Sequence, residues 1–204
     1  MAYLKVDNIA NNSRDFVAPR SLNNTGKSVI REARIEDIPG ILGLYQRVAS
    51  IPGGLARLRD EVTEDYVESF VGKAIARGCI YVDAVDEPGY NNIKAEIHAY
   101  SPALYCFSHQ LSDLTIAVDP QSQGSGLGRR IFETFMTRVQ ETMPGITRIE
   151  LIARESNRRA IEFYQSLGFV IEGRFENRIK NIDGSFEADI PMAWTLTHAL
   201  GSDR

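Results

Sequence analysis

The chain has 204 residues, a formal net charge of -4, 43% hydrophobic residues and 25% charged residues. These values are typical of one folded domain with a hydrophobic core, and they exclude a disordered or collagen-like protein. No apolar run approaches the length of a membrane helix, about 18 residues, and residues 1–14 lack the apolar segment of a secretory signal. We therefore expect neither a membrane helix nor a secretory signal. The mildly acidic balance argues against broad nucleic-acid binding, which normally needs a basic surface.

The two cysteines, Cys79 and Cys106, are too few for a disulfide scaffold and are compatible with a reducing compartment. We therefore expect a cytoplasmic protein. A zinc site is conceivable from Cys106 and His109 together with His98 and Cys79, but zinc sites usually contain two closely spaced ligand pairs and only one pair is present. We expect no metal.

Residues 1–27 contain five asparagines and no clear periodicity, which predicts an N-terminal extension before a single domain over residues 28–204. Hydrophobic spacing and turn signals then predict the elements of an α/β fold, a mixed α+β arrangement around one sheet. They are, in order, a strand at 28–33, helices at 35–49 and from 63, strands at 79–85, 93–100 and 111–118, a helix with its buried face at 131–139, a strand at 148–153, a helix at 157–167, and strands at 170–174 and 188–194.

The densest chemical signal is a glycine-rich turn at residues 118–130, between a predicted strand and a predicted helix. Glycines permit close backbone approach, and the start of a helix offers unpaired N–H groups, so this turn is suited to bind a phosphate or pyrophosphate. A flexible turn with no ligand is the alternative interpretation. The dinucleotide motif fails here, because Arg129 stands where its last glycine belongs, and a P-loop ending at 25–28 lacks both its first glycine and a following helix.

The turn resembles the acyl-CoA loop of the GNAT superfamily of N-acetyltransferases, whose motif Gln/Arg-x-x-Gly-x-Gly/Ala lies at a strand-to-helix junction. Residues 114–120 are similar to the fourth strand of that family, and residues 157–169 resemble its second motif, N-x-x-A-x-x-F/L-Y-x-x-x-G-F. The resemblance covers residues 29–196 and leaves residues 1–27 without a counterpart. It implies a mostly antiparallel, twisted central sheet with helices on both faces, acetyl-CoA as co-substrate, and transfer of an acetyl group to a primary amine.

The resemblance also implies roles for individual residues. Tyr164 corresponds to the general acid at the cofactor sulfur, and Asn157 to a hydrogen-bonding group near the pantetheine. These two residues are seven positions apart, about two helical turns, so they share one face of their helix. The strand backbone that pairs with the pantetheine corresponds to Ile116, Ala117 and Val118, and the pyrophosphate loop to Gln123, Gly124, Ser125, Gly126, Leu127, Gly128 and Arg129.

The identity of the general base stays open, because Ile152 stands where some family members have a glutamate. Glu150, Asp113, Glu96, His98 and a water chain are the candidates. Alternation along the strand places Glu96 and His98 on one side, where they form either a catalytic pair or an exposed polar face.

The acceptor is expected to be an amine of a small molecule or a protein, and the chain could also pair with a second copy of itself. An acidic sheet face would favour a cationic amine through steering. We expect residues 51–57, residues 101–110 and the late strands to form the acceptor pocket, with 101–110 selecting the acceptor. The alternative function is a non-catalytic acyl-CoA-binding sensor.

Overall fold

The computed structural model describes residues 28–51, 53–84 and 92–196. The predicted extension at 1–27 and residues 85–91, between the strands predicted at 79–85 and 93–100, lie outside the described residues. Eight strands, four α-helices and four short 3-10 helices make up this part of the chain. The α-helices are α1 (Ile38–Ala49), α2 (Glu64–Arg77), α3 (Leu127–Thr142) and α4 (Arg158–Gln165). The strands are β1 (Val29–Glu32), β2 (Gly78–Ala84), β3 (Ala95–Tyr100), β4 (Gln110–Val118), β5 (Arg148–Arg154), β6 (Val170–Ile171), β7 (Phe175–Lys180) and β8 (Phe186–Thr195).

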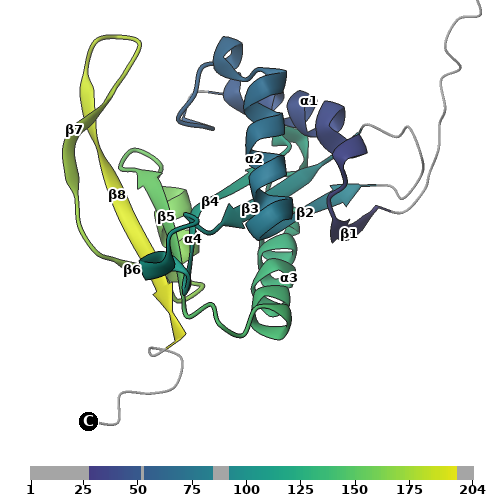
Figure 1. Ribbon diagram of the computed structural model, residues 1–204. Helices are drawn as coiled ribbons and strands as arrows, with labels where there is room; N and C mark the ends of the chain where they lie inside the picture. The colour runs from purple at the N-terminus through teal and green to yellow at the C-terminus, as the bar shows by residue number, and fades with distance from the viewer. Residues whose placement is uncertain (1–27, 52, 85–91, 197–204) are drawn as a thin grey trace, which may run out of the picture.

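The strands form one mixed sheet in the order β1-β2-β3-β4-β5-β8-β6, with β7 paired to β8. Every pairing is antiparallel except that of β4 with β5, which is parallel. The long β7–β8 hairpin projects away from the rest of the sheet (Figure 1). The expected mostly antiparallel sheet is confirmed.

Two hydrophobic cores cover opposite faces of the sheet. Ile97 and Leu114 face the core that contains α3 and α4, whereas Val82 and Ala117 face the core that contains α1 and α2. These assignments follow the alternation of side chains along a strand. The prediction of helices on both faces is therefore confirmed.

Two helices, α2 and α4, begin where the sequence predicts, because a side-chain cap marks each start. Thr63 caps α2 by accepting a hydrogen bond from the Tyr66 amide at 3.3 Å, and Asn157 caps α4 in the same way from the Ala160 amide at 3.2 Å. The first predicted helix is divided into a 3-10 turn at Ile35–Asp37 followed by α1, which has Pro39 in its first turn.

The late strands differ from the prediction. The strand expected at 170–174 ends at Ile171, and the separate strand β7 was not predicted. Five of the six β7 residues are exposed, so the segment FENRIK has no buried alternation that would indicate a strand. Its pairing with β8 supplies the backbone hydrogen bonds that define it.

Candidate functional site

A cleft lies where β4 and β5 separate. The two strands pair only at Gln110 with Arg148 and at Leu111 with Ile149, although both strands continue beyond these pairs. The edge of β4 that faces β5 is therefore open over residues 112–118, and a cleft of about 660 Å³ occupies this region. Its lining comes from four places: the end of α1 and the following loop (Val48, Ile51, Gly53, Gly54, Leu55, Ala56), β4 (Leu114, Thr115, Ile116, Val118), the glycine-rich turn (Ser122, Gln123, Gly124, Gly126, Gly128, Arg129), and β5 with α4 (Ile152, Ala153, Arg154, Asn157, Arg159, Ala160, Phe163, Tyr164).

The glycine-rich turn is held in place at both ends. At its start, Asp119 accepts hydrogen bonds from the Arg47 side chain at 2.7 Å and from the Gln121 amide at 2.9 Å. At its end, Arg130 donates to the Ser125 carbonyl at 3.2 Å. Gly126, the residue before α3, has φ +80°, a conformation that favours glycine. The turn is thus fixed by contacts outside the cleft.

The turn presents unpaired backbone donors to the cleft. The first amide of α3 with an acceptor in the described part of the chain is that of Arg130, which donates to the Gly126 carbonyl at 3.1 Å. The amides of Leu127, Gly128 and Arg129 precede it, at the positive end of the helix dipole. These donors, with the Arg129 side chain beside them, fit a pyrophosphate group.

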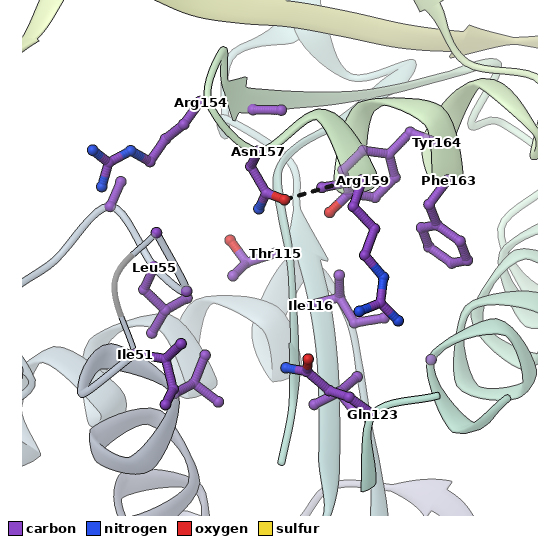
Figure 2. A pocket seen from close by; sticks show the side chains of 18 of the residues that line it. Ile51, Leu55, Thr115, Ile116, Gln123, Arg154, Asn157, Arg159, Phe163 and Tyr164 are labelled. Carbon is purple, nitrogen blue, oxygen red and sulfur yellow. Dashed lines mark hydrogen bonds between the residues drawn. The ribbon is translucent and has the colours of Figure 1, made fainter. Parts of the chain in front are cut away.

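Tyr164 and Asn157 enter the cleft from α4. Figure 2 shows both side chains directed into it, across from Ile51 and Leu55 of the loop after α1. The Tyr164 ring packs against Phe132, Phe163 and Phe169 and is 8% exposed. This burial raises the pKa of the phenol, which keeps the hydroxyl protonated at neutral pH. The amide oxygen of Asn157 caps α4, so its NH₂ group is available as a donor.

The loop after α1 forms the wall opposite α4. Its position depends on Gly54, because a Cβ at this residue would lie 2.3 Å from the Val48 carbonyl oxygen. The loop can therefore fold tightly against the end of α1 and present Ile51 and Leu55 to the cleft. Ile51 and residues 53–56, from the segment expected to form the acceptor pocket, line this cleft.

The charged residues that line the cleft are Arg129, Arg154 and Arg159. Arg154 donates to Glu187 and Asn181 of the β7–β8 hairpin, and Arg129 donates to Ser166 at 2.9 Å. Figure 2 shows Arg159 extending towards Gln123. The described lining contains no carboxylate, so it gives no support to an acidic face that would steer a cationic amine.

Most of the predicted cofactor residues line the cleft. They are Ile116, Val118, Gln123, Gly124, Gly126, Gly128, Arg129 and Asn157, together with the predicted acid Tyr164. Ala117 and Leu127 instead point into the two cores, and Ser125 is exposed outside the cleft lining. Any role of these three residues would rest on their backbone groups.

None of the four predicted base residues lines the cleft. Glu150 accepts from Arg148 at 2.6 Å and from Ser112 at 3.2 Å. Asp113, which has φ +56° at an irregular point of β4, lies near Tyr100 and contributes to raising the pKa of that phenol. Glu96 and His98 are buried between the sheet and the helices α1 and α2, so the alternative of an exposed polar face is wrong.

Several expected contributors lie elsewhere. No residue of 101–110 and none of the described residues after Tyr164 belongs to the cleft lining. Among the described residues no cluster of three or more His, Cys, Asp or Glu could hold a metal ion, and no helix there is both long and apolar enough to cross a membrane. The sequence did not single out Val48, Thr115, Arg154 and Phe163, because only the separation of β4 from β5 brings them to one cleft.

The sequence also matches known proteins. Residues 72–169 match the family model described as Acetyltransferase (GNAT) family. The match covers just under half of the chain. The matched residues include β4, the glycine-rich turn and α4, which carry most of the cleft.

Individual relatives agree with this match. The [ribosomal protein bS18]-alanine N-acetyltransferase of Escherichia coli (strain K12) is 37% identical over 75 residues, which are 37% of this chain and 49% of that protein. The chain thus spans about half the length of the curated relatives it matches. The crystal structure of the ribosomal-protein-S18-alanine N-acetyltransferase from Escherichia coli has a TM-score of 0.64 and 25% identity, covering 87% of this chain and 98% of that one. A putative acetyltransferase from Salmonella typhimurium, solved with its cofactor acetyl-CoA, has a TM-score of 0.63 and 18% identity, covering 83% and 94%.

Proposed function

We propose that the protein is an acetyl-CoA-dependent N-acetyltransferase that transfers an acetyl group directly to a primary amine. The observation that carries this proposal is the cleft at the open edge of β4, with unpaired amides at one end and the Tyr164 hydroxyl inside it. A cytoplasmic location is part of the proposal, and the two cysteines, both free thiols, support a reducing compartment.

The residues of the cleft fit an extended, amide-bearing cofactor with an anionic end. The backbone of Ile116, Ala117 and Val118 would pair with the pantetheine as a neighbouring strand does, because no β5 residue occupies that edge. The amides at the start of α3 would hold the pyrophosphate. Acetyl-CoA would supply an activated acetyl group as a thioester, and the Asn157 amide would donate a hydrogen bond beside it.

Tyr164 would act as the general acid. Attack by the amine forms the new C–N bond and breaks the C–S bond, and the departing thiolate needs a proton. A buried phenol that stays protonated at neutral pH is suited to provide it. After attack the nitrogen loses its surplus proton, which restores the phenol, so the product is a neutral amide and a free thiol.

The test is transfer of the acetyl group, measured by thiol release from acetyl-CoA. The panel would contain a peptide that begins with alanine, chosen because the Escherichia coli relative is named for an alanine of ribosomal protein bS18, together with polyamines and free amino acids. Thiol release with at least one amine is expected. Tight acetyl-CoA binding without transfer to any amine would instead support the sensor function.

Tyr164→Phe provides the matching variant. We expect kcat to fall by about 100-fold or more, because general acid catalysis typically contributes about 10²–10⁴-fold, while the acetyl-CoA Kd stays within about twofold. The double variant Tyr164→Phe with Phe163→Tyr moves the hydroxyl to the neighbouring ring. Its turnover should stay as low as that of Tyr164→Phe, because the acid must lie at the cofactor sulfur. Unchanged turnover in Tyr164→Phe would remove this residue from the mechanism.

A further inference from the structure

A buried cluster of polar side chains lies between the sheet and the helices α1 and α2. Glu96 and His98, both on β3, are 0% and 2% exposed. The Tyr45 hydroxyl donates to Glu96 Oε2 at 2.6 Å, and His98 Nδ1 lies 2.9 Å from Glu96 Oε1. The Phe70 ring stacks on the imidazole at 4.2 Å with an interplanar angle of 9°. Such an arrangement is costly to bury unless it is fully hydrogen-bonded.

The contacts fix the orientation of the imidazole. A carboxylate in its ionised form can only accept, and with Glu96 in that form the proton between Glu96 and His98 belongs to Nδ1. Nε2 then carries the lone pair, and it has no hydrogen-bond partner among the described residues. A carboxylate that holds Nδ1–H in place is the arrangement that prepares an imidazole to accept a proton at Nε2.

The cluster lies next to the cleft. His98 is the cross-strand partner of Thr115, which lines the cleft. Opposed residues of an antiparallel pair point to the same side, with Cβ atoms about 4.5–5.5 Å apart. The phenols of Tyr45 and Tyr164 are also within electrostatic range, since Tyr164 adds to the rise in the pKa of Tyr45 that burial and Glu96 mainly cause. Thr115 therefore separates His98 from the cleft by one side chain.

We propose that His98 accepts the proton that the acceptor ammonium gives up before attack, through a water held at Thr115. Glu96 and Tyr45 are positioning residues that orient the imidazole. This inference rests on the proposed N-acetyltransferase function and fills the role for which the cleft lining offers no carboxylate or imidazole.

The protons balance in this scheme. The ammonium gives one proton to Nε2 of His98 and becomes a nucleophilic amine. After the C–N bond forms and the C–S bond breaks, the second proton replaces the one that Tyr164 has given to the thiolate. His98 then releases its proton to solvent. The net reaction converts an ammonium and a thioester into an amide, a thiol and one proton.

Other ionisable groups surround the imidazole, and the pH test must account for them. Lys73 and Arg77 of α2 lie over the Tyr100 ring, and Arg57 lies over the Tyr66 ring. Among the described residues, Glu96 and Tyr100 on β3 and Tyr45 on α1 contact His98 directly. The groups around these contacts are Tyr66, Lys73 and Arg77 of α2, Arg57 of the loop before α2, and Asp113 on β4.

The kinetic test compares two variants with matched controls, using the most rapidly acetylated amine of the panel. His98→Gln should lower kcat by about 10²–10⁴-fold without a comparable change in the acetyl-CoA Kd. Glu96→Gln keeps hydrogen bonds to Tyr45 and His98 but removes the negative charge that stabilises the imidazolium. The acidic limb of its kcat/KM profile should therefore move to lower pH, with a lower plateau.

The controls are His109→Gln and Glu141→Gln, since neither residue lines the cleft. They should leave rate and pH profile unchanged. An unmoved acidic limb in Glu96→Gln, or a His98→Gln variant that folds, binds acetyl-CoA and turns over normally, would overturn the proposal. A purely structural role would change the melting temperature of both variants without moving the limb.

If the wild type acetylates no amine on the panel, the proposed function is refuted. The orientation of the His98 imidazole can then still be tested by a measurement that needs no acceptor. The chain has three histidines, so ¹⁵N NMR with His98→Gln as the assignment variant can identify the His98 signals. At neutral pH we expect a proton on Nδ1, a bare Nε2, and a change in the Nε2 shift when acetyl-CoA is added. A proton on Nε2 with a bare Nδ1, or an unresponsive Nε2, would overturn the proposal.

Discussion

The two faces of the sheet use aromatic side chains in different ways. Under α3 and α4, Phe132 contacts the rings of Phe135, Phe163, Tyr164 and Phe169, so aromatic rings pack mainly on one another. Under α1 and α2, rings instead surround an imidazole and a carboxylate. Packing of rings on one face thus supports the side of the cleft that α4 forms. The other face keeps the hydrogen-bonded pair of Glu96 and His98 beside the cleft. The difference predicts that loss of ring volume destabilises the face under α3 and α4, whereas loss of a single hydroxyl destabilises the face under α1 and α2.

Gly126→Val should have the largest effect on the cofactor side. Valine is strained at φ +80°, and its side chain would lie where the pyrophosphate must approach. We expect the acetyl-CoA Kd, measured by calorimetry, to rise by at least about 100-fold, or about 2.8 kcal/mol. Gly145→Val, at a glycine with no atoms within 4 Å of an added Cβ, is the control and should bind normally. Retained affinity in Gly126→Val would contradict the assigned site.

Phe132→Ala tests whether packing dominates the face under α3 and α4. The side chain is fully buried, so its removal should lower the free energy of unfolding by about 3–5 kcal/mol. Urea denaturation monitored by circular dichroism measures this change. Phe186→Ala, at a side chain that is 56% exposed, should cost less than about 1 kcal/mol. Equal losses at the two positions would show that the aromatic cluster is not a tight core.

Tyr45→Phe tests the opposite face. The variant keeps the ring and removes only the hydroxyl that donates to Glu96, leaving one buried carboxylate oxygen without that donor. We expect a loss of about 1–3 kcal/mol in the same denaturation experiment. Tyr105→Phe, where the ring is 95% exposed, should be neutral. A neutral Tyr45→Phe would mean that water replaces the lost donor, and the two faces would then differ less than their contacts indicate.

The smallest expected effect is a difference in the alkylation of the two cysteine thiols. Burial, with a contribution from Glu32, raises the pKa of Cys79 to about 12, whereas Cys106 is exposed on the segment after β3. Alkylation requires the thiolate, so iodoacetamide at pH 8 should modify Cys106 alone in the folded protein and both cysteines after unfolding. Mass spectrometry counts the adducts. Rapid modification of Cys79 at pH 8 would show that the face under α3 opens readily.

Much of the fold could be predicted because its helices and inner strands carry strong local signals. The caps Thr63 and Asn157 and the buried spacing of α3 mark helices without reference to the rest of the chain. The strand β7 could not be predicted, because five of its six side chains are exposed and only its pairing with β8 defines it.

Part of the site could be predicted from the sequence and part could not, for a similar reason. The turn at 123–129 and the helix residues Asn157 and Tyr164 belong to continuous motifs, so their roles could be proposed from the sequence, and most of them line one cleft. Alternation placed Glu96 and His98 on one side of β3, but it could not indicate which layer covers that side. The covering rings, Tyr45 and Phe70, come from helices about 30–50 residues earlier in the chain. Their burial depends on tertiary packing alone.

The brief parallel pairing of β4 with β5 has a mechanical consequence. Two residue pairs at the base of the cleft form the only ladder that joins the two halves of the described sheet. Leu111 and Ile149, which form one of these pairs, are both fully buried, so the strands separate from an aliphatic contact. This contact lies outside the cleft lining, so a change of side-chain volume there would alter the width of the cleft without altering any residue that lines it.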